Sequence, residues 1–312
     1  MLPLTPSTAT LTPPPVAAAL ANTLTPAQID QYRRDGYVVV ESLFSKGELA
    51  RTRDVIDEMT RAAIASGADY KKVLELEPEL IDGQRVARRI YDPFEQHEQF
   101  RALATSPKML DRVEALIGPD LMIHHSKLNM KPPRVGSAVE WHQDLTYFPH
   151  TNSDLVTTLV YLDDATPENG CLQVLPGEHH RFFNHANPDG SFAGMITEDF
   201  LKQSPSKPVP LSAPAGSVIF MSCILPHASL PNRSPDPRRT LIYEFRAADA
   251  FSIYFGPKVL EFEKKAHLVR GTPATHARCE AGFNPPIPNV GAEMKSLYEV
   301  QLEAKKRATA HM

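Results

Sequence analysis

Glu140-Trp141-His142-Gln143-Asp144 is the stretch of this 312-residue sequence from which the rest of the chain is best interpreted. His142 and Asp144 are separated by one residue, so on an extended strand both side chains project from the same face. An imidazole nitrogen and a carboxylate oxygen then lie within reach of one cation. Because the pattern His-x-Asp also occurs by chance, the prediction of a metal site depends on residues further along the chain.

The third metal ligand is expected to be His227, in the segment Leu225-Pro226-His227-Ala228-Ser229. Residues 217–225 read as a strand, and period-two alternation puts every second residue from Ile219 to Leu225 on the face of His227. Two imidazoles and one carboxylate on one side of a metal, with open positions opposite, form the facial triad of non-haem Fe(II) sites.

Arg238 stands eleven residues after His227 and is followed by the strand-like run Thr240–Phe245. A guanidinium that enters an apolar barrel needs a planar anion, and a carboxylate bound in a bidentate manner is the best match. A dicarboxylate cosubstrate would supply this group. Alternation along the strand lets only one of Arg238 and Arg239 point inward, and the spacing favours Arg238, which leaves Arg239 as a solvated surface charge.

The composition is that of an ordinary globular protein, with 42% hydrophobic and 22% charged residues. A net charge of -4 gives no electrostatic reason to expect binding to nucleic acid or to an anionic membrane surface. The three cysteines are too few and too scattered for a disulfide framework or a structural zinc site. No stretch has the apolar length needed to span a bilayer, and we therefore expect a cytoplasmic protein.

The chain divides into a Thr/Pro/Ala-rich tail, residues 1–23, and a single domain over residues 24–312. The tail cannot bury enough apolar surface to offset the entropy cost of ordering. Capping boxes that begin at Thr25 and Ser45 predict two helices early in the domain, and a third is expected over residues 106–118. An amphipathic helix is expected near the C-terminus, at residues 294–307.

From Leu121 onward the pattern changes to short strands broken by Gly, Pro and Asn. Strands are expected at residues 37–41, 121–131, 154–162, 171–175, 217–225 and 240–246, and in the segment that enters His142. This order predicts an α+β protein whose sheet curls into a double-sheet jelly roll, with the N-terminal helices packed outside. Residues 182–208 read as a long insertion that could act as a lid, and this insertion and residues 251–257 are where we look for substrate specificity.

Three motifs carry a resemblance to a known family. They are His142-Gln143-Asp144-Leu145-Thr146-Tyr147-Phe148-Pro149, followed by Asp154-Leu155; Asn169-Gly170-Cys171-Leu172-Gln173-Val174-Leu175-Pro176-Gly177-Glu178-His179; and His227-Ala228-Ser229-Leu230-Pro231-Asn232-Arg233-Ser234, followed by Arg238. Together they resemble the phytanoyl-CoA dioxygenase family of Fe(II)- and 2-oxoglutarate-dependent oxygenases, over most of residues 25–255. The resemblance implies a double-stranded β-helix (cupin-like jelly-roll) core. It also implies that His142, Asp144 and His227 bind iron and that Arg238 clamps the distal carboxylate of 2-oxoglutarate.

The resemblance further implies that Ser229 and Lys131 hold the cosubstrate. Lys127, Asn129 and Lys131 share one face of the expected strand 121–131, and would otherwise be three polar residues facing an apolar barrel. Lys127 and Asn129 are therefore candidates for contact with substrate. The alternative for Lys131 is a rim lysine that lies over apolar surface.

The substrate itself is not defined by the sequence. Members of the family that act on phytanoyl-CoA carry a Trp at the position of Val160, so the smaller residue implies a remodelled pocket. Thr158 shares the parity of Val160, and both are expected to line that pocket. An acyl-CoA, a free amino or hydroxy acid and a natural-product intermediate all stay open, and Val160 favours the last two. Any of three arginines could pair with an acidic group of the substrate, and nothing in the sequence selects among them: Arg88, Arg89 and Arg246.

The expected activity is hydroxylation of an unactivated C–H bond of a small molecule, with Fe(II), 2-oxoglutarate and O2 required and with succinate and CO2 as co-products. Asp144 favours hydroxylation over halogenation, because related halogenases lack the carboxylate ligand. Desaturation or multi-step oxidation by the same site stays open. So do a cupin-like hydrolase or isomerase with the same three ligands and a non-catalytic small-molecule binder, although Arg238 argues against the hydrolase. The oligomeric state is also left open.

Overall fold

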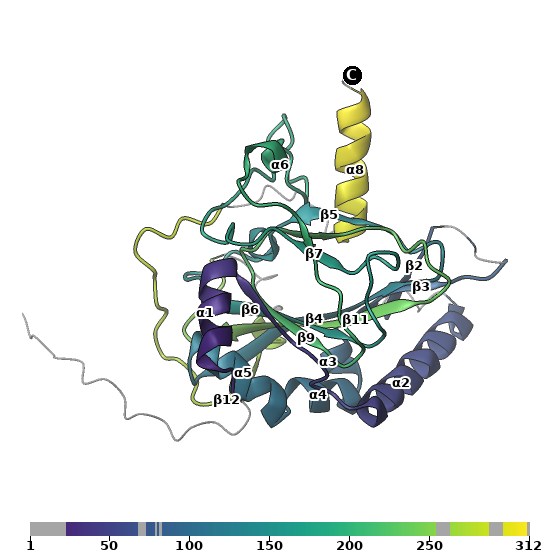
Figure 1. Cartoon of the computed structure of the whole chain (residues 1–312), viewed down its shortest axis with the longest axis horizontal. Coiled ribbons are helices and arrows are strands. Elements are labelled where there is room, and N and C mark those ends of the chain that lie inside the picture. The colour runs from purple at the N-terminus through teal and green to yellow at the C-terminus, as the bar shows by residue number, and fades with distance from the viewer. Residues whose placement is uncertain are drawn as a thin grey trace, which may run out of the picture.

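The computed structural model describes residues 23–67, 73–78, 80, 83–253, 263–286 and 296–310. Most of the expected N-terminal tail and residues 254–257 of the second specificity segment lie outside these ranges. Within them, two antiparallel β-sheets lie one above the other, and helices cover the outer face of the larger sheet (Figure 1). No helix among these residues has the length and apolar character needed to cross a membrane.

The helices begin where their capping residues predict. In α1 (Pro26–Asp35) the Thr25 side chain accepts a hydrogen bond from the backbone of Gln28, and in α2 (Lys46–Ala65) Ser45 accepts one from Glu48. The third expected helix is α5 (Pro107–Ile117), and the C-terminal one is α8 (Leu297–Ala310). Three short helices were not expected from the sequence: α3 (Pro93–Gln96), α4 (Glu98–Ala104) and α6 (Phe200–Gln203).

The larger sheet has the strand order β1-β9-β6-β11-β4-β3-β2, with β12 paired to β4. Its strands are β1 (Tyr37–Val40), β9 (Val218–Ser222), β6 (Leu155–Tyr161), β11 (Arg238–Ala247), β4 (Leu121–Lys131), β3 (Ala87–Tyr91), β2 (Leu74–Leu76) and β12 (His267–Arg270). The smaller sheet has the order β5-β10-β7-β8, made of β5 (Val139–His142), β10 (His227–Ser229), β7 (Leu172–Val174) and β8 (Val209–Pro210). All the strands expected from the sequence are confirmed, whereas β2, β3, β8, β10 and β12 were not expected as separate strands.

One strand boundary differs from the prediction in a way that affects the site. The strand expected over residues 217–225 ends at Ser222, and His227 opens the separate strand β10 in the other sheet. The position of His227 at the site is therefore not due to side-chain alternation along the strand that contains Ile219. It reaches the site because β10 pairs with β5, with His227 directly opposite His142.

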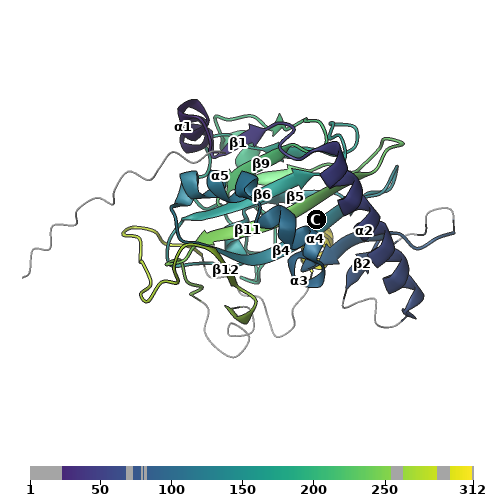
Figure 2. The same cartoon turned by 90° about the horizontal axis from the view of Figure 1, so that it is seen from below.

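The two faces of the larger sheet have different partners. Its outer face packs on α2, α4 and α5 around apolar residues such as Phe220, Leu241 and Leu128 (Figure 2). Its inner face meets the smaller sheet, where Leu159, Ile219 and other apolar side chains form a second core. The inner positions of β4 and β3 are polar instead, and they border a pocket between the sheets.

Residues 182–208 pack against the smaller sheet through a small apolar cluster. Phe183, Ile196 and Phe200 are buried there, with Trp141 of β5 packed against them. The backbone N–H of Ile196 donates to the Trp141 carbonyl over 2.7 Å. The insertion is thus attached directly to the strand that carries His142.

Candidate metal centre

Three buried side chains meet at the edge of the smaller sheet. His142 ends β5, Asp144 begins the short 3-10 turn Asp144–Thr146, and His227 begins β10. The Nε2 atom of His142 lies 3.6 Å from one Asp144 oxygen, and that of His227 lies 3.7 Å from the other. One ligand atom from each residue lies within 4.8 Å of the others, so a single cation can contact all three. The structure thus brings together the three predicted ligands.

Backbone carbonyls hold both imidazoles in the orientation that metal binding requires. The Nδ1 atom of His142 lies 2.8 Å from the Glu140 carbonyl, and that of His227 lies 2.9 Å from the Leu225 carbonyl. Since a carbonyl only accepts, Nδ1 carries the proton and the Nε2 lone pair is free to face Asp144. Burial, with the nearby His142, lowers the pKa of His227 to about 3 and keeps that ring neutral. Two neutral imidazole nitrogens and a carboxylate form a donor set that suits Fe(II).

The Asp144 carboxylate is kept ionised although it is buried. Burial acts to raise its pKa, but Lys127, His227 and His142 together bring the pKa well below the usual value. Lys127 lies 3.4 Å from one carboxylate oxygen. These neighbours therefore favour the anionic form that a metal ligand needs.

A second carboxyl group, that of Glu244, lies close to the predicted metal ligand Asp144. The Thr157 hydroxyl lies 3.0 Å from Asp144 Oδ2 and 2.5 Å from Glu244 Oε2, and Lys127 lies 3.2 Å from Glu244 Oε1. Because a hydroxyl carries one proton, a bond to each carboxyl group requires that one of the two be protonated, and the lowered pKa of Asp144 leaves Glu244 as that one. Burial and the charge of Asp144 both raise the pKa of Glu244, in agreement with this.

Sequence reasoning did not identify Glu244 or Thr157, although a signal was present. Glu244 is six residues after Arg238 on the same strand, so it shares the inward parity of Arg238 in an otherwise apolar run. A charged residue at such a position needs a buried partner.

Arg238 lies in the pocket as predicted, 4% exposed. It donates to the Thr240 hydroxyl over 2.7 Å and to the Gly170 carbonyl. Its Nε is buried without a hydrogen-bond partner, and no carboxylate of the described residues lies within ion-pair distance. Burial lowers the pKa of Arg238. A buried guanidinium with neutral partners only is costly, so an anion such as the 2-oxoglutarate carboxylate fits this position.

Arg239 is not the solvated surface charge that the sequence predicted. It is only partly exposed and forms a two-pronged ion pair with Asp163, at 2.9 and 2.7 Å. The side chain points away from the pocket, as alternation requires.

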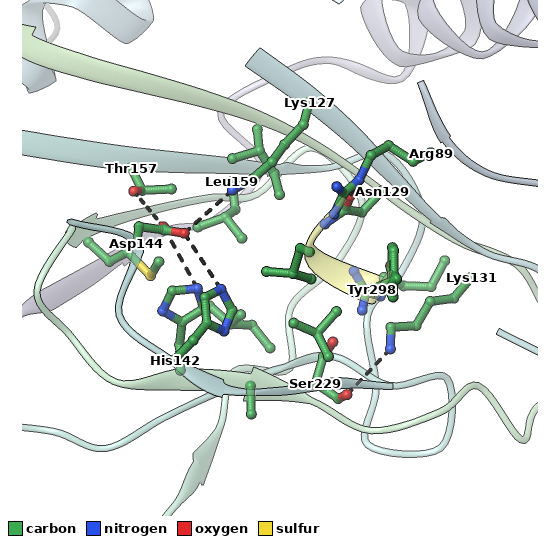
Figure 3. Close-up of a pocket in the computed structure, with 18 residues that line it drawn as sticks. Arg89, Lys127, Asn129, Lys131, His142, Asp144, Thr157, Leu159, Ser229 and Tyr298 are labelled. Carbon is green, nitrogen blue, oxygen red and sulfur yellow. Dashed lines mark hydrogen bonds and ion pairs between the residues drawn. The ribbon is translucent and has the colours of Figure 1, made fainter. Parts of the chain in front are cut away.

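Lys131 lies opposite Arg238 in the pairing of β4 with β11, and it is 2% exposed. It donates to the carbonyls of Ser137 and Leu230, both at 2.6 Å. Burial and the neighbouring guanidinium bring the pKa of Lys131 well below its usual value. The rim-lysine alternative is therefore wrong. Ser229 lines the same pocket, and its backbone carbonyl lies 3.4 Å from the Lys131 ammonium (Figure 3).

The predicted substrate contacts divide into two groups. Lys127 and Asn129 line the pocket, but Thr158 and Val160 do not. Thr157 and Leu159 take their places on the inner face. All seven residues of β6 are buried, so hydrophobicity could not reveal which face is inner.

The structure places Thr158 and Val160 on the outer face of β6. Val160 packs in the core under the helices, opposite Leu241 and Val218 in the neighbouring strands. The hydroxyl of Thr158 lies 3.4 Å from the Tyr243 carbonyl. The absence of a Trp at residue 160 is therefore a change in the helix-facing core, not in the wall of the pocket.

Three residues of the pocket wall come from elements outside the predicted sheet. Arg89 lies on β3, and Tyr298 on α8 reaches the pocket together with Leu297. The Arg89 guanidinium carbon lies 4.9 Å from the centre of the Tyr298 ring. No sequence signal could place Tyr298 here, because its docking depends on long-range packing.

Comparison with known proteins agrees with this geometry. The model of the family described as phytanoyl-CoA dioxygenase (PhyH) matches residues 32–240. The chain is 31% identical to a probable alpha-ketoglutarate-dependent hypophosphite dioxygenase of Stutzerimonas stutzeri, over 72% of this chain and 79% of that protein. It is 31% identical to a methylphosphonate hydroxylase of Gimesia maris, over 72% of this chain and 82% of the relative. It is 28% identical to human peroxisomal phytanoyl-CoA dioxygenase, over 74% and 71% of the two chains.

Among solved structures, EctD from S. alaskensis with bound Fe superposes with a TM-score of 0.64 at 26% identity. The match covers 86% of this chain and 89% of that chain.

Proposed function

The chain belongs to the phytanoyl-CoA dioxygenase family of Fe(II)- and 2-oxoglutarate-dependent oxygenases, and from this we propose that it hydroxylates a small molecule in the pocket beside His142, Asp144 and His227. One observation carries the proposal: a facial set of two neutral imidazoles and a carboxylate shares its pocket with a buried guanidinium that has no anionic partner among the described residues. Iron binding needs the first feature, and a dicarboxylate cosubstrate needs the second.

Iron bound with 2-oxoglutarate and O2 supplies the oxidising power to break an unactivated C–H bond, with succinate and CO2 as co-products. The chain supplies position and charge. The carbonyls of Glu140 and Leu225 fix the two imidazoles, and Lys127 and Thr157 fix the carboxylate of Asp144. Such supporting contacts typically change metal affinity or activity about 10- to 100-fold when they are removed.

Arg238, Lys131 and Ser229 are proposed to hold 2-oxoglutarate. The two basic groups face each other across β4 and β11, and neither has a carboxylate partner among the described residues. Arg238 offers a planar fork that is already oriented by Thr240 and Gly170, so binding a carboxylate requires little rearrangement.

The substrate is proposed to be a small anion. Two of the relatives are named for phosphorus oxyanions, hypophosphite and methylphosphonate, and this supports an anionic substrate here. The space between the sheets supports a small one, because 2-oxoglutarate would share the same pocket with the substrate. Hydroxylation is the reaction favoured by the carboxylate ligand Asp144, with desaturation or further oxidation by the same site as the alternative.

The two sheets are proposed to form the double-stranded β-helix of this family, in one domain over residues 24–312. Residues 182–208 are proposed to cover the site as a lid. One contact with the insertion supports the lid: the Gln143 side chain accepts from the Phe183 N–H over 2.8 Å. It also donates over 2.8 Å to the carbonyl of Arg181, the residue just before the insertion. Because Gln143 lies between His142 and Asp144 in the sequence, a movement of the insertion would shift the backbone that carries these two proposed ligands.

The test is succinate formation by purified protein with Fe(II), ascorbate, 2-oxoglutarate and a panel of small anions. We expect succinate release that requires O2 and rises with at least one panel member. Asp144→Ala should abolish it, while Glu140→Ala, a change on the same strand that leaves the ligands intact, should not. Tight zinc binding without any O2-dependent succinate release would support a hydrolase instead.

A further inference from the structure

The pocket contains more positive charge than iron and 2-oxoglutarate binding explain. Four basic residues line it: Arg89, Lys127, Lys131 and Arg238. Lys127 is paired with the carboxylates of Asp144 and Glu244. Lys131 and Arg238 are assigned to 2-oxoglutarate under the proposed function. Arg89 is left without a role.

Arg89 is held in the pocket by neutral groups. It is 7% exposed, lies opposite Asn129 in the pairing of β3 with β4, and donates from Nε to the Asn129 side-chain oxygen over 3.0 Å. Its other side is covered by the Tyr298 ring. Among the described residues no carboxylate lies within 4.0 Å of its guanidinium.

The other two arginines considered from the sequence do have carboxylate partners. Arg88 pairs with Glu75 at 2.5 Å, and Arg246 pairs with Glu263 at 2.7 Å. Neither lines the pocket, whereas Arg89 does. The structure therefore selects one of the three.

A buried guanidinium whose Nε is used by an amide oxygen keeps its two terminal nitrogens for another partner. Desolvation makes an uncompensated cation costly, and the planar pair of terminal N–H groups matches two oxygens of one oxyanion. Figure 3 shows Arg89, Asn129 and Tyr298 grouped on one side of the pocket, with Asp144 and His142 across from them. An anionic group held here would place the rest of a small molecule toward the metal ligands.

We propose that Arg89, Asn129 and Tyr298 form an anion subsite that binds the oxyanion of the substrate, a phosphonate, phosphinate or carboxylate group. The proposal rests on the proposed function and names the residues that select its substrate. Arg89 supplies the charge, and Asn129 fixes the guanidinium through its oxygen. Tyr298 holds the guanidinium plane from above.

The C-terminal helix is needed for this subsite. Tyr298 lies in α8, beyond residue 240, where the match to the family model ends. The Gln301 side chain accepts from the Glu140 N–H over 3.1 Å and donates to the Gly194 carbonyl over 2.8 Å, which fixes the helix on β5 and on the 182–208 insertion. Specificity is thus set partly by a segment outside the matched region.

The experiment measures the binding of defined probes to the protein loaded with Fe(II) and 2-oxoglutarate without O2, by calorimetry. The probes are methylphosphonate, hypophosphite, acetate and the uncharged dimethyl methylphosphonate. The variants are Arg89→Gln and the matched control Arg88→Gln, which removes a neighbouring arginine that also stacks on Tyr298 but is neutralised by Glu75.

Wild-type protein should bind at least one anion and not the uncharged ester. The phosphorus and carboxylate probes show which kind of oxyanion is preferred. Arg89→Gln should raise the Kd of that anion about 10- to 100-fold, the loss expected for charge-assisted hydrogen bonds. It should leave the Kd of 2-oxoglutarate unchanged, which also shows that the variant is folded. Arg88→Gln should change neither Kd by more than about threefold, because Arg88 does not line the pocket.

Three results would overturn the subsite and leave the dioxygenase assignment intact. Arg89→Gln could bind the anion as tightly as wild-type protein does, or wild-type protein could bind the ester as tightly as the anions. The third result is wild-type protein that binds Fe(II) and 2-oxoglutarate but none of the anions. Loss of 2-oxoglutarate binding in Arg89→Gln would also overturn it, because the two sites would then not be separate. Failure of the wild-type protein to bind Fe(II) and 2-oxoglutarate would count against the proposed function instead.

Discussion

Replacing Arg238 by Gln should remove 2-oxoglutarate binding while leaving the fold in place. The side chain is buried, and in the free protein it donates only to the Thr240 hydroxyl and the Gly170 carbonyl among the described residues. Gln can keep one of these neutral contacts. The substitution therefore removes chiefly the cation and its unused Nε–H, which are the groups assigned to the carboxylate.

The size of the effect follows from the kind of interaction lost. Truncating one partner of a buried, hydrogen-bonded charge pair costs about 2 to 5 kcal/mol. At about 1.4 kcal/mol per factor of ten, the Kd of 2-oxoglutarate should rise from about 30-fold to a few thousand-fold. Ligand at 100 times Kd stabilises wild-type protein by about 2.7 kcal/mol. With about 2 to 4 °C per kcal/mol, the wild-type Tm should rise by roughly 5 to 10 °C. The variant at the same concentration should gain less than about a third of that.

The assay is thermal unfolding of wild type, Arg238→Gln and Arg239→Gln, each with Fe(II), with and without 2-oxoglutarate, in the absence of O2. Arg239→Gln is the matched control because the adjacent guanidinium faces away from the pocket and pairs with Asp163. Its own stability should fall by about 1.5 to 3 kcal/mol, because hydrogen bonds to a largely buried carboxylate are lost, with an unchanged ligand-induced shift. Equal 2-oxoglutarate shifts in the two variants would refute the assignment of Arg238 as the clamp.

Three further predictions concern the surroundings of the site. Thr157→Val removes the hydroxyl between Asp144 and Glu244 and should weaken Fe(II) affinity about 10- to 100-fold. Thr158→Val, on the outer face of β6, should leave Fe(II) affinity unchanged. A titration of both variants with Fe(II) tests this, and equal affinities would contradict it. Gly170→Ala should lower the free energy of unfolding by about 2 kcal/mol or more, because at φ +77° its new Cβ would lie 2.2 Å from the Leu230 carbonyl oxygen. Gly67→Ala, at φ +73° with nothing within 4 Å, should lower the free energy of unfolding by only about 1 to 2 kcal/mol. Urea unfolding measures both, and equal losses would be inconsistent with the clash. Burial lowers the pKa of His150 from 6.5 to about 4, so the unfolded chain binds a proton that the folded chain does not, and stability falls as the pH drops from about 6.5 to about 4. His150→Gln should reduce the loss between pH 7.5 and pH 5 by up to about 2 kcal/mol in urea titrations, and an unchanged pH dependence would disprove the contribution.

The sequence predicted structure best where a short pattern of residue types has one main structural role. A Ser or Thr cap with Glu or Gln three residues later placed the starts of α1 and α2. The spacing of His142 and Asp144 placed two ligand groups on one side of a strand end. Arg238 was separated from Arg239 because only one side chain of an adjacent pair can face inward.

The sequence was least informative where both faces of an element are buried. Each residue of β6 is apolar, aromatic or Thr, so the residue types do not distinguish the inner face from the outer face. The prediction that Thr158 and Val160 face the pocket was therefore wrong. The inner face is set by pairing with β11, where Thr157 lies opposite Glu244. Pairing between distant segments is a tertiary property that single-strand patterns do not contain.

The same limit applies to the residues that complete the pocket. Arg89 lies on a five-residue strand that contains two adjacent arginines, so its sequence does not read as part of a sheet. Tyr298 reaches the site only because α8 docks on β5 through Gln301. The contact between the Arg89 guanidinium and the Tyr298 ring joins segments that are far apart in sequence, and no local pattern predicts it.

The central claim is that His142, Asp144 and His227 hold iron next to bound 2-oxoglutarate. The most direct test is anaerobic addition of 2-oxoglutarate to the Fe(II)-loaded protein, followed by visible absorption spectroscopy. We predict a ferrous-to-2-oxoglutarate charge-transfer band in wild-type protein that is lost in His227→Ala and retained in Glu140→Ala. A band that persists in His227→Ala, or no band in wild-type protein that binds Fe(II), would contradict the claim.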